Sequence, residues 1–465
     1  MTRHKRFILF LILVFLFLLI TPLVILYSQG YRFNLRDRKI TQTGGLYLNV
    51  RPKGASVYLD DKLLKKTDFL FGKIFIDDLV PRKYKIEIKK DGYYSWQKNL
   101  EIVESLTTEA KNIFLVPKDP EFTSLGDKID AFFFSPDNEK VVLKKEGEEG
   151  FTLDLLDLRN NTQSPLINEK DLAIKGQTIK SLDLDWSADS KKILIEVISQ
   201  KKKFFIFDIE SKEKPISLDF LGENLSNLSF DPGNSQKIFF TQSLNKKNVL
   251  LSADYKKKGI SDPILENLIA YKISNGSLYW LDKNGFLFQS NLVGVKITNF
   301  NLQPLALKKG GEYQIFIFGE KIFLEEGGNL YFFNDKSQSL EKISEEVSDL
   351  KPSPDLKKVV YFTNSEMWVF FLENIDNEQP QRKGEEKLFL TRFSEKINDV
   401  FWWTSHYLIF SVGNEIKITE IDDRDRINIY TLADFKNLKI FWDKYTEKLY
   451  VLSQRDLFSS KKLLP

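Results

Sequence analysis

The chain has 465 residues, of which 42% are hydrophobic and 14% aromatic, so it is long enough for more than one domain and can bury a sizeable core. It contains no cysteine, which excludes disulfides, thiolate nucleophiles and cysteine metal sites, and its two histidines, His4 and His406, do not suggest a histidine metal cluster. Residues 1–44 hold seven basic residues against one acidic residue, whereas the net charge of the whole chain is +3. The rest of the chain is therefore slightly acidic, and nucleic acid is not an expected partner.

An apolar segment opens the chain. Residues 7–27, FILFLILVFLFLLITPLVILY, carry no charge, and at about 1.5 Å per residue a helix of this length spans a bilayer core of about 30 Å. We expect a transmembrane anchor at 7–27, a basic cytoplasmic leader at 1–6 and a juxtamembrane linker at 28–43. The alternative is a cleaved signal peptide, although the apolar run is longer than the usual ~7–15 residues. Basic residues flank both ends, so the orientation rests on the short N-terminus, which favours a body outside the cytoplasm.

The remainder predicts an all-β protein. Short runs of Val, Ile, Phe, Tyr and Trp are separated by Asn, Asp, Gly, Ser and Pro, and no long segment has a helical period. The segment PKDPEF, Pro117–Phe122, carries two prolines and three charges and is the best candidate for a domain boundary. Residues 44–117 then form a small first domain, and its alternating segments LYLNV and SVYLD are typical of half-buried strands in a β-sandwich.

The first of these domains resembles the PEGA domain. Pro52-Lys53-Gly54-Ala55 matches the motif between two strands, Asp60 begins the next turn, and Gly92-Tyr93 matches a later Gly-Tyr pair. Asp61 stands where the family usually has glycine, and Lys66-Thr67-Asp68 replaces its Gly-x-Thr-Pro break. The resemblance covers about 70 residues, and it implies a β-sandwich that is usually attached to membrane anchors or envelope domains. It does not imply an enzyme. Pro52 fixes φ and Gly54 relieves a turn, so the motif is expected to be a structural corner.

From residue 121 onward the chain repeats a unit of strand, tight polar turn and strand, which a third strand usually follows. The aligned turns recur every ~40–50 residues, the period of a β-propeller blade. They fall at Ser135, Ser187, Asp231, Ser274, near Lys308, and at Ser353, Thr404 and Asp443. We therefore expect a propeller at 121–465 with eight blades, or seven if the weak fifth unit is discounted. The last unit shows three strands, and Glu121–Gly126 is expected to supply its fourth and so close the ring.

Two of these turns resemble the TolB-like, WD40-like repeat. The units are Ser135-Pro136-Asp137 and Ser353-Pro354-Asp355, and both lack the glycine that completes the Ser-Pro-Asp-Gly pattern of that family. Ser and Asp side chains bond their own backbone and Pro fixes φ, so these residues are expected to build hairpins and not to bind ligands.

The sequence offers no motif for catalysis. It has no G-x-S-x-G elbow, no P-loop, no dinucleotide fingerprint and no cluster with metal-ligand spacing. Paired carboxylates such as Asp183 and Asp185 occur, but no spacing selects a pair for glycoside hydrolysis. We expect no cofactor and no metal. Within Phe401-Trp402-Trp403, we name Trp402 and Trp403 as candidates for an aromatic binding surface, the other interpretation being packing between blades.

These features favour a single-pass membrane protein of the bacterial cell envelope that presents a propeller to a protein or a cell-wall glycan and has no enzymatic activity. The alternatives are an anchored hydrolase that acts on polysaccharide through propeller carboxylates, and a scaffold that faces the cytoplasm.

Overall fold

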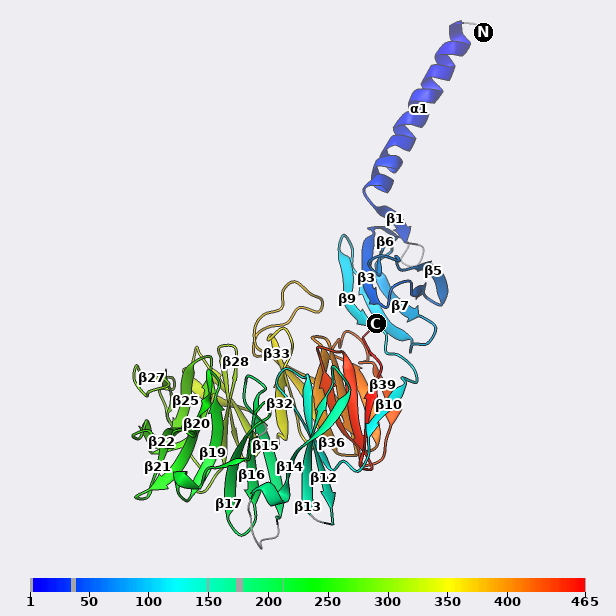
Figure 1. Cartoon of the computed structure of the whole chain (residues 1–465). Helices are drawn as coiled ribbons and strands as arrows, with labels where there is room; N and C mark the ends of the chain where they lie inside the picture. Colours follow the sequence, from blue (N-terminus) through cyan, green and yellow to red (C-terminus); the bar gives the residue numbers. More distant parts are fainter. Residues whose placement is uncertain (1–2, 35–38, 149, 173–178, 212, 465) are drawn as a thin grey trace.

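The computed structural model describes residues 3–34, 39–148, 150–172, 179–211 and 213–464 (Figure 1). Positions 1–2 of the predicted leader and 35–38 of the predicted linker lie outside these residues. The chain begins with one long helix, α1 (Arg3–Ser28), and almost all of the remaining regular structure is β-strand. Within the described residues, Lys5–Ser28 is the one helix long and apolar enough to cross a membrane. Pro22 lies inside this helix without ending it.

A short hairpin joins α1 to the first β-unit. It consists of β1 (Tyr31–Asn34) and β2 (Lys39–Gln42), which pair antiparallel. The guanidinium of Arg32 donates to the carbonyl of Tyr27 at 2.8 Å and lies 3.6 Å from the centre of the Tyr27 ring. The same side chain forms an ion pair with Asp78 at 2.8 Å. Arg32 therefore connects the last turn of the helix to the first β-unit.

The first β-unit consists of two sheets around one core. The sheets have the strand orders β6-β3-β9 and β5-β4-β7-β8, and β3 and β9 run parallel. Alternate residues of β3, β7 and β8 are buried, as half-buried strands require, and they form a shared core centred on Trp96. The strands are β3 (Gly44–Arg51), β4 (Ser56–Leu59), β5 (Lys62–Lys66), β6 (Lys73–Leu79), β7 (Arg82–Lys89), β8 (Trp96–Ile102) and β9 (Thr107–Phe114).

The second unit contains eight antiparallel sheets among the described residues. Six consist of four consecutive strands, one has a fifth strand, and one joins three consecutive strands to a strand from the start of the unit. The first four sheets are β11 (Ala131–Phe134), β12 (Lys140–Gly147), β13 (Gly150–Asp157) and β14 (Thr162–Asn168); β15 (Ser181–Trp186), β16 (Lys192–Ile198), β17 (Lys202–Asp208) and β18 (Ile216–Ser217); β19 (Leu225–Asp231), β20 (Asn234–Leu244), β21 (Lys247–Asp254) and β22 (Gly259–Ile260), with β23 (Leu265–Glu266) beside β21; and β24 (Leu268–Ser274), β25 (Ser277–Asp282), β26 (Leu287–Asn291) and β27 (Thr298–Asn299). The other four are β28 (Tyr313–Phe318), β29 (Lys321–Glu326), β30 (Asn329–Asn334) and β31 (Ser339–Ser344); β32 (Asp349–Pro352), β33 (Lys358–Phe362), β34 (Glu366–Phe371) and β35 (Lys387–Arg392); β36 (Ile397–Thr404), β37 (Tyr407–Val412), β38 (Glu415–Glu420) and β39 (Ile429–Asp434); and β10 (Phe122–Gly126) with β40 (Lys439–Asp443), β41 (Lys448–Ser453) and β42 (Asp456–Ser460).

These sheets form a closed ring. Each sheet shares a hydrophobic cluster with the sheet that follows it in the chain. A further cluster joins the last sheet to the first, with Tyr450 and Leu457 packed against Phe132 and Val141. The last sheet takes β10 as its fourth strand, antiparallel to β42, so the predicted closure by Glu121–Gly126 is confirmed. Radially arranged four-stranded sheets, with the first and last strands of the unit joined in one sheet, define a β-propeller.

One of the predicted turns was wrong. The fifth hairpin turns at Gly319-Glu320, between β28 and β29, and Lys308 lies in the loop that precedes β28. The polar Lys-Lys-Gly-Gly run at 308–311 has the composition of a turn. The hairpin turn itself is the shorter pair Gly319-Glu320, at the end of the apolar strand that follows this run. Gly319 has a φ of +63°, which a two-residue hairpin needs and glycine adopts without strain.

Candidate functional site

The joint between the two β-units holds a network of hydrogen bonds and an ion pair. The propeller packs against the side of the first unit formed by β8 and β9, which lie side by side. Three propeller segments reach this side, namely the loop between β34 and β35, the turn between β36 and β37 and the loop between β38 and β39. Figure 1 shows the first of these loops rising from the ring toward β9.

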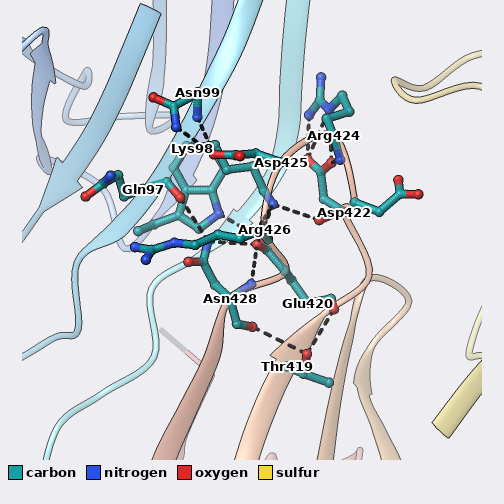
Figure 2. Close-up of polar contacts among 12 residues, drawn as sticks. Gln97, Lys98, Asn99, Thr419, Glu420, Asp422, Arg424, Asp425, Arg426 and Asn428 are labelled. Carbon is teal, nitrogen blue, oxygen red and sulfur yellow. Dashed lines mark hydrogen bonds and ion pairs between the residues drawn. The ribbon is translucent and has the colours of Figure 1, made fainter. Parts of the chain in front are cut away.

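At the centre of the joint lies a buried ion pair (Figure 2). Lys98 Nζ is 2.8 Å from Glu420 Oε1, and the two side chains are 0% and 3% exposed. Lys98 Nζ also donates to the carbonyls of Asp422 at 2.7 Å and Arg426 at 2.9 Å. Trp96 Nε1 donates to the second carboxylate oxygen of Glu420 at 2.8 Å. Each charge is thus both paired and hydrogen-bonded, which a buried charge requires.

Burial governs the protonation of Glu420. Removal from water raises the pKa of this carboxyl, and the charge of Lys98 and the hydrogen bonds from Lys98 and Trp96 offset the rise only in part. The neighbouring Asp422 has the opposite outcome. Burial raises its pKa as well, but the hydrogen bonds and charge of Arg424 outweigh the effect and hold the pKa below its usual value.

Further polar contacts extend this centre toward solvent. Asn428 donates through Nδ2 to Glu420 Oε1 at 2.7 Å and to the carbonyl of Gln97 at 3.2 Å. Asp425 accepts from both the backbone and the side-chain amide of Asn99, at 2.8 and 3.0 Å. In Figure 2 these side chains point into the space between β8 and the loop that follows β38. The joint is therefore specified by hydrogen bonds as well as by apolar contact.

A second group of contacts lies beside the first, at the turn between β36 and β37. His406 sits in this turn, as predicted, and its Nε2 lies 3.0 Å from Asn112 Nδ2 and 2.8 Å from Glu378 Oε2. The hydroxyl of Tyr407 accepts from the backbone N–H of Phe114, and the Phe114 ring packs edge-on against the Tyr407 ring. A small cavity of about 60 Å³ lies between the two groups of contacts.

The prediction of an aromatic binding surface at Trp402 and Trp403 is wrong, because neither side chain is exposed. Their exposed fractions are 5% and 2%, and they pack into the two clusters on either side of their sheet. Trp402 Nε1 donates to the carbonyl of Lys351, and the ring of Phe114 packs edge-on against Trp403. The physical reason is that neighbouring residues of a strand point to opposite faces and that this sheet is covered on both faces, so consecutive rings enter different clusters.

The Ser-Pro-Asp residues lie in hairpin turns. Ser353 is 1% exposed; its Oγ accepts from the backbone N–H of Lys358 at 3.0 Å and donates to Asp355. Ser135 and Asp137 make the same pair of contacts, and Pro136 and Pro354 occupy the second positions of the two turns. Asn138 Nδ2 also donates to Asp443 at 2.8 Å, which links the first turn to the last sheet.

Replacing Ser353 by alanine is expected to lower the free energy of unfolding by about 1–3 kcal/mol, because the buried N–H of Lys358 loses its acceptor. Urea denaturation of the full chain in detergent measures this change. The matched change Ser243→Ala, at an exposed serine of β20, should stay within about 0.5 kcal/mol. Equal effects of the two changes would show that the turn bond contributes nothing.

The predicted motif residues of the first unit lie at its corners. Pro52 and Gly54 follow β3, Gly54 has a φ of +71°, and Ala55 is fully buried. Asp60 bonds Arg82 at 2.5 Å in the turn after β4. Gly92 and Tyr93 form the turn after β7, where Tyr93 makes a bridge to Pro117.

A wide cavity lies on the inner side of four sheets, next to the propeller axis. It measures about 810 Å³, and the first strands β15, β19, β24 and β28 line it. Asp185 and Lys272 both contribute to its wall, and burial raises the pKa of the Asp185 carboxyl. The cavity supplies polar groups of both charges and is large enough for a small polar ligand.

The comparisons with known proteins address the fold. The sequence matches no model of a known protein family and no curated protein, so the resemblance to PEGA domains stays a prediction. Three solved structures that resemble the chain are the β-propeller domain of Cps50 (Swd1) from Myceliophteria thermophila (12% identity, 72% of this chain and 97% of that chain, TM-score 0.41), Hsv2 from Kluyvelomyces marxianus (14%, 67% and 99%, 0.42) and the oligogalacturonate lyase VPA0088 from Vibrio parahaemolyticus (13%, 68% and 94%, 0.39). At such low similarity they indicate nothing about activity. The sheets and clusters described above define the class: a β-propeller protein with an N-terminal apolar helix.

Proposed function

We propose that this protein is a membrane-anchored scaffold that binds a partner through its propeller and has no catalytic role. In this proposal α1 is the anchor, the first unit is a PEGA-like β-sandwich that acts as a stalk, and the eight sheets are the blades of the propeller. The buried joint carries the proposal. Because Lys98 and Glu420 are paired out of water, the propeller is held on the stalk in one orientation.

This orientation leaves the face of the ring opposite the first unit free to bind a partner. The joint uses the turn between β36 and β37 and the loop between β38 and β39, which lie at the same end of their sheet. The hairpins between second and third strands lie at the opposite end of each sheet. Figure 1 shows α1 and the propeller on opposite sides of the first unit. The free hairpins therefore point away from the anchor, and loops on a rigid ring suit recognition of a protein or a cell-wall glycan.

The absence of cysteine allows a direct test of topology. In intact cells a membrane-impermeant maleimide is expected to label Ser243→Cys, at an exposed position of β20, and to leave Thr2→Cys unlabelled until the cells are lysed. This result places the propeller outside the cytoplasm. The reverse pattern contradicts the envelope location and makes the protein a scaffold that faces the cytoplasm.

A further inference from the structure

The first β-unit exposes a group of apolar side chains at the edge opposite β8 and β9, the strands that contact the propeller. Both sheets end there in unpaired edge strands, β5 and β6, which the loop at 67–72 connects. Phe69, Leu70 and Phe71 at the tip of this loop are 85%, 66% and 65% exposed. We call the whole surface the apolar edge, and it consists of Leu63, Leu64, Phe69, Leu70, Phe71 and Phe75. Exposed aromatic and aliphatic side chains gathered in this way mark an interaction site.

The fold holds this loop in a defined shape. Asp68 Oδ1 accepts from the backbone N–H groups of Leu70 at 2.9 Å and Phe71 at 2.6 Å, and its Oδ2 accepts from that of Lys73 at 2.6 Å. These bonds lower the pKa of Asp68, the one from Phe71 most strongly. Thr67, next to it, exchanges two hydrogen bonds with the buried Ala55. The Pro-Lys-Gly-Ala corner thus supports a loop whose apolar side chains point into solvent.

Four lysines surround the apolar edge. Lys62, Lys65, Lys66 and Lys73 are exposed within it, and in the described part of the chain none of them forms an ion pair. Asp60, Asp61 and Asp78 of the same unit pair with Arg82, Lys85 and Arg32, and Asp68 accepts hydrogen bonds from backbone donors. Apolar rings beside unpaired lysines match a surface that is apolar inside and anionic outside.

The position of the apolar edge relative to α1 indicates that this apolar and anionic surface is the lipid bilayer. Figure 1 shows α1 leaving the first unit away from the propeller and leaning toward the side that carries β5. The hairpin after α1 adds Phe33 and Ile40, exposed by 57% and 58%. The unit is short, since the eight residues of β3 span roughly 26 Å. The connection Gln29-Gly30 between α1 and β1 is two residues long, and Gly30 has a φ of +82°.

We propose that the apolar edge rests on an anionic lipid surface, with Phe69, Leu70 and Phe71 among the acyl chains and the lysines at the headgroups. The proposal rests on the membrane anchoring proposed above. The stalk then lies along the bilayer on its β5/β6 side, and the propeller, which occupies the β8/β9 side, faces away from the lipid. The exposed edge strands are thereby covered by the membrane.

One introduced thiol tests this contact in the full chain. Phe69→Cys carries an environment-sensitive NBD label, and Val293→Cys, 68% exposed on the propeller, is the matched control. The proteins are reconstituted into phosphatidylcholine vesicles with and without phosphatidylglycerol. With phosphatidylglycerol, the label at 69 is expected to be quenched by a lipid-phase doxyl group and shielded from iodide. The label at 293 is expected to be quenched by iodide and not by the doxyl lipid. Lys65→Gln/Lys66→Gln is expected to lower the equilibrium constant for lipid contact by about 30-fold, because each lysine near an anionic surface contributes about five-fold.

Two results overturn the proposal. A label at 69 that iodide quenches and doxyl lipid does not shows an edge in water. Formation of a disulfide-linked dimer by unlabelled Phe69→Cys, with the label shielded from both quenchers, shows that a second copy covers the edge. Alkaline carbonate extraction is measured in parallel and reports on α1 alone. Release by carbonate contradicts the anchor, whereas the label at 69 decides the lipid contact in either case.

Discussion

Replacing Lys98 by methionine is expected to lower the free energy of unfolding by about 3–5 kcal/mol, because the carboxylate of Glu420 then stays buried without its cation. The carbonyls of Asp422 and Arg426 lose their shared donor at the same time. Urea denaturation of the full chain, followed by tryptophan fluorescence, measures the change, since Trp96 lies in contact with Glu420. A separate first transition at low urea would report release of the propeller from the stalk.

Two control variants separate the buried charge from a general effect of losing a lysine. Lys85→Met removes the exposed partner of Asp61 and should cost about 0–1 kcal/mol. The double variant Lys98→Met/Glu420→Gln should recover part of the loss, because it leaves no buried charge at the centre of the joint. A loss below about 1 kcal/mol for Lys98→Met would contradict the role given to this pair.

The effect of Lys98→Met is expected to depend on pH in a defined direction. Burial raises the pKa of Glu420 in the folded protein above its value in the unfolded chain. The folded state therefore binds the proton more tightly, and the stability that this provides is present at low pH and is lost as the pH rises through the folded pKa. Removal of Lys98 widens this difference. The variant should be closest to the parent below the ordinary pKa of glutamate and furthest from it near neutrality.

Leu457→Ala is expected to lower the free energy of unfolding by about 2–5 kcal/mol. Leu457 is fully buried on β42 in the cluster that joins the last sheet to the first. The same strand pairs with β10, so the substitution leaves a cavity where the ring closes. Thermal or urea unfolding with circular dichroism gives the change.

The control for this variant is another leucine of the propeller. Leu356, in the turn after β32, is 53% exposed, and Leu356→Ala should change stability by no more than about 0.5 kcal/mol. If both substitutions cost the same, the ring does not depend on its closure cluster. A large loss for Leu457→Ala alone supports closure as a main source of propeller stability.

The ring-closing strand and the buried Lys98–Glu420 ion pair differ in how far they could be predicted from the sequence. The closure strand was predictable, because the last repeat lacks one strand and an unused apolar segment precedes the first. The Lys98–Glu420 pair was missed, although a signal exists. Along β8 the buried positions alternate, and Lys98 stands between Trp96 and Leu100 at a position where an apolar residue is expected. The alternation shows that a charge is buried but does not identify its partner, which lies more than 300 residues away in the chain.

The sequence was also insufficient to place the neighbouring Trp402 and Trp403. The sequence indicates that one of two neighbouring rings must leave the core face of a regular strand. It does not show that a hydrophobic cluster lies on each side of this sheet in the ring. Both rings are buried for that reason. The exposed aromatic side chains Phe69 and Phe71 lie instead on the first unit.

By itself the sequence determined the local structure of this protein: an apolar helix, short alternating strands and turns that recur at a propeller period. Each of these follows from the spacing of apolar and turn residues within a few dozen positions. Only the tertiary structure decided which charges are buried together and which apolar side chains remain exposed. Those outcomes depend on contacts between segments far apart in the chain, where the position of one unit against another fixes both burial and partner.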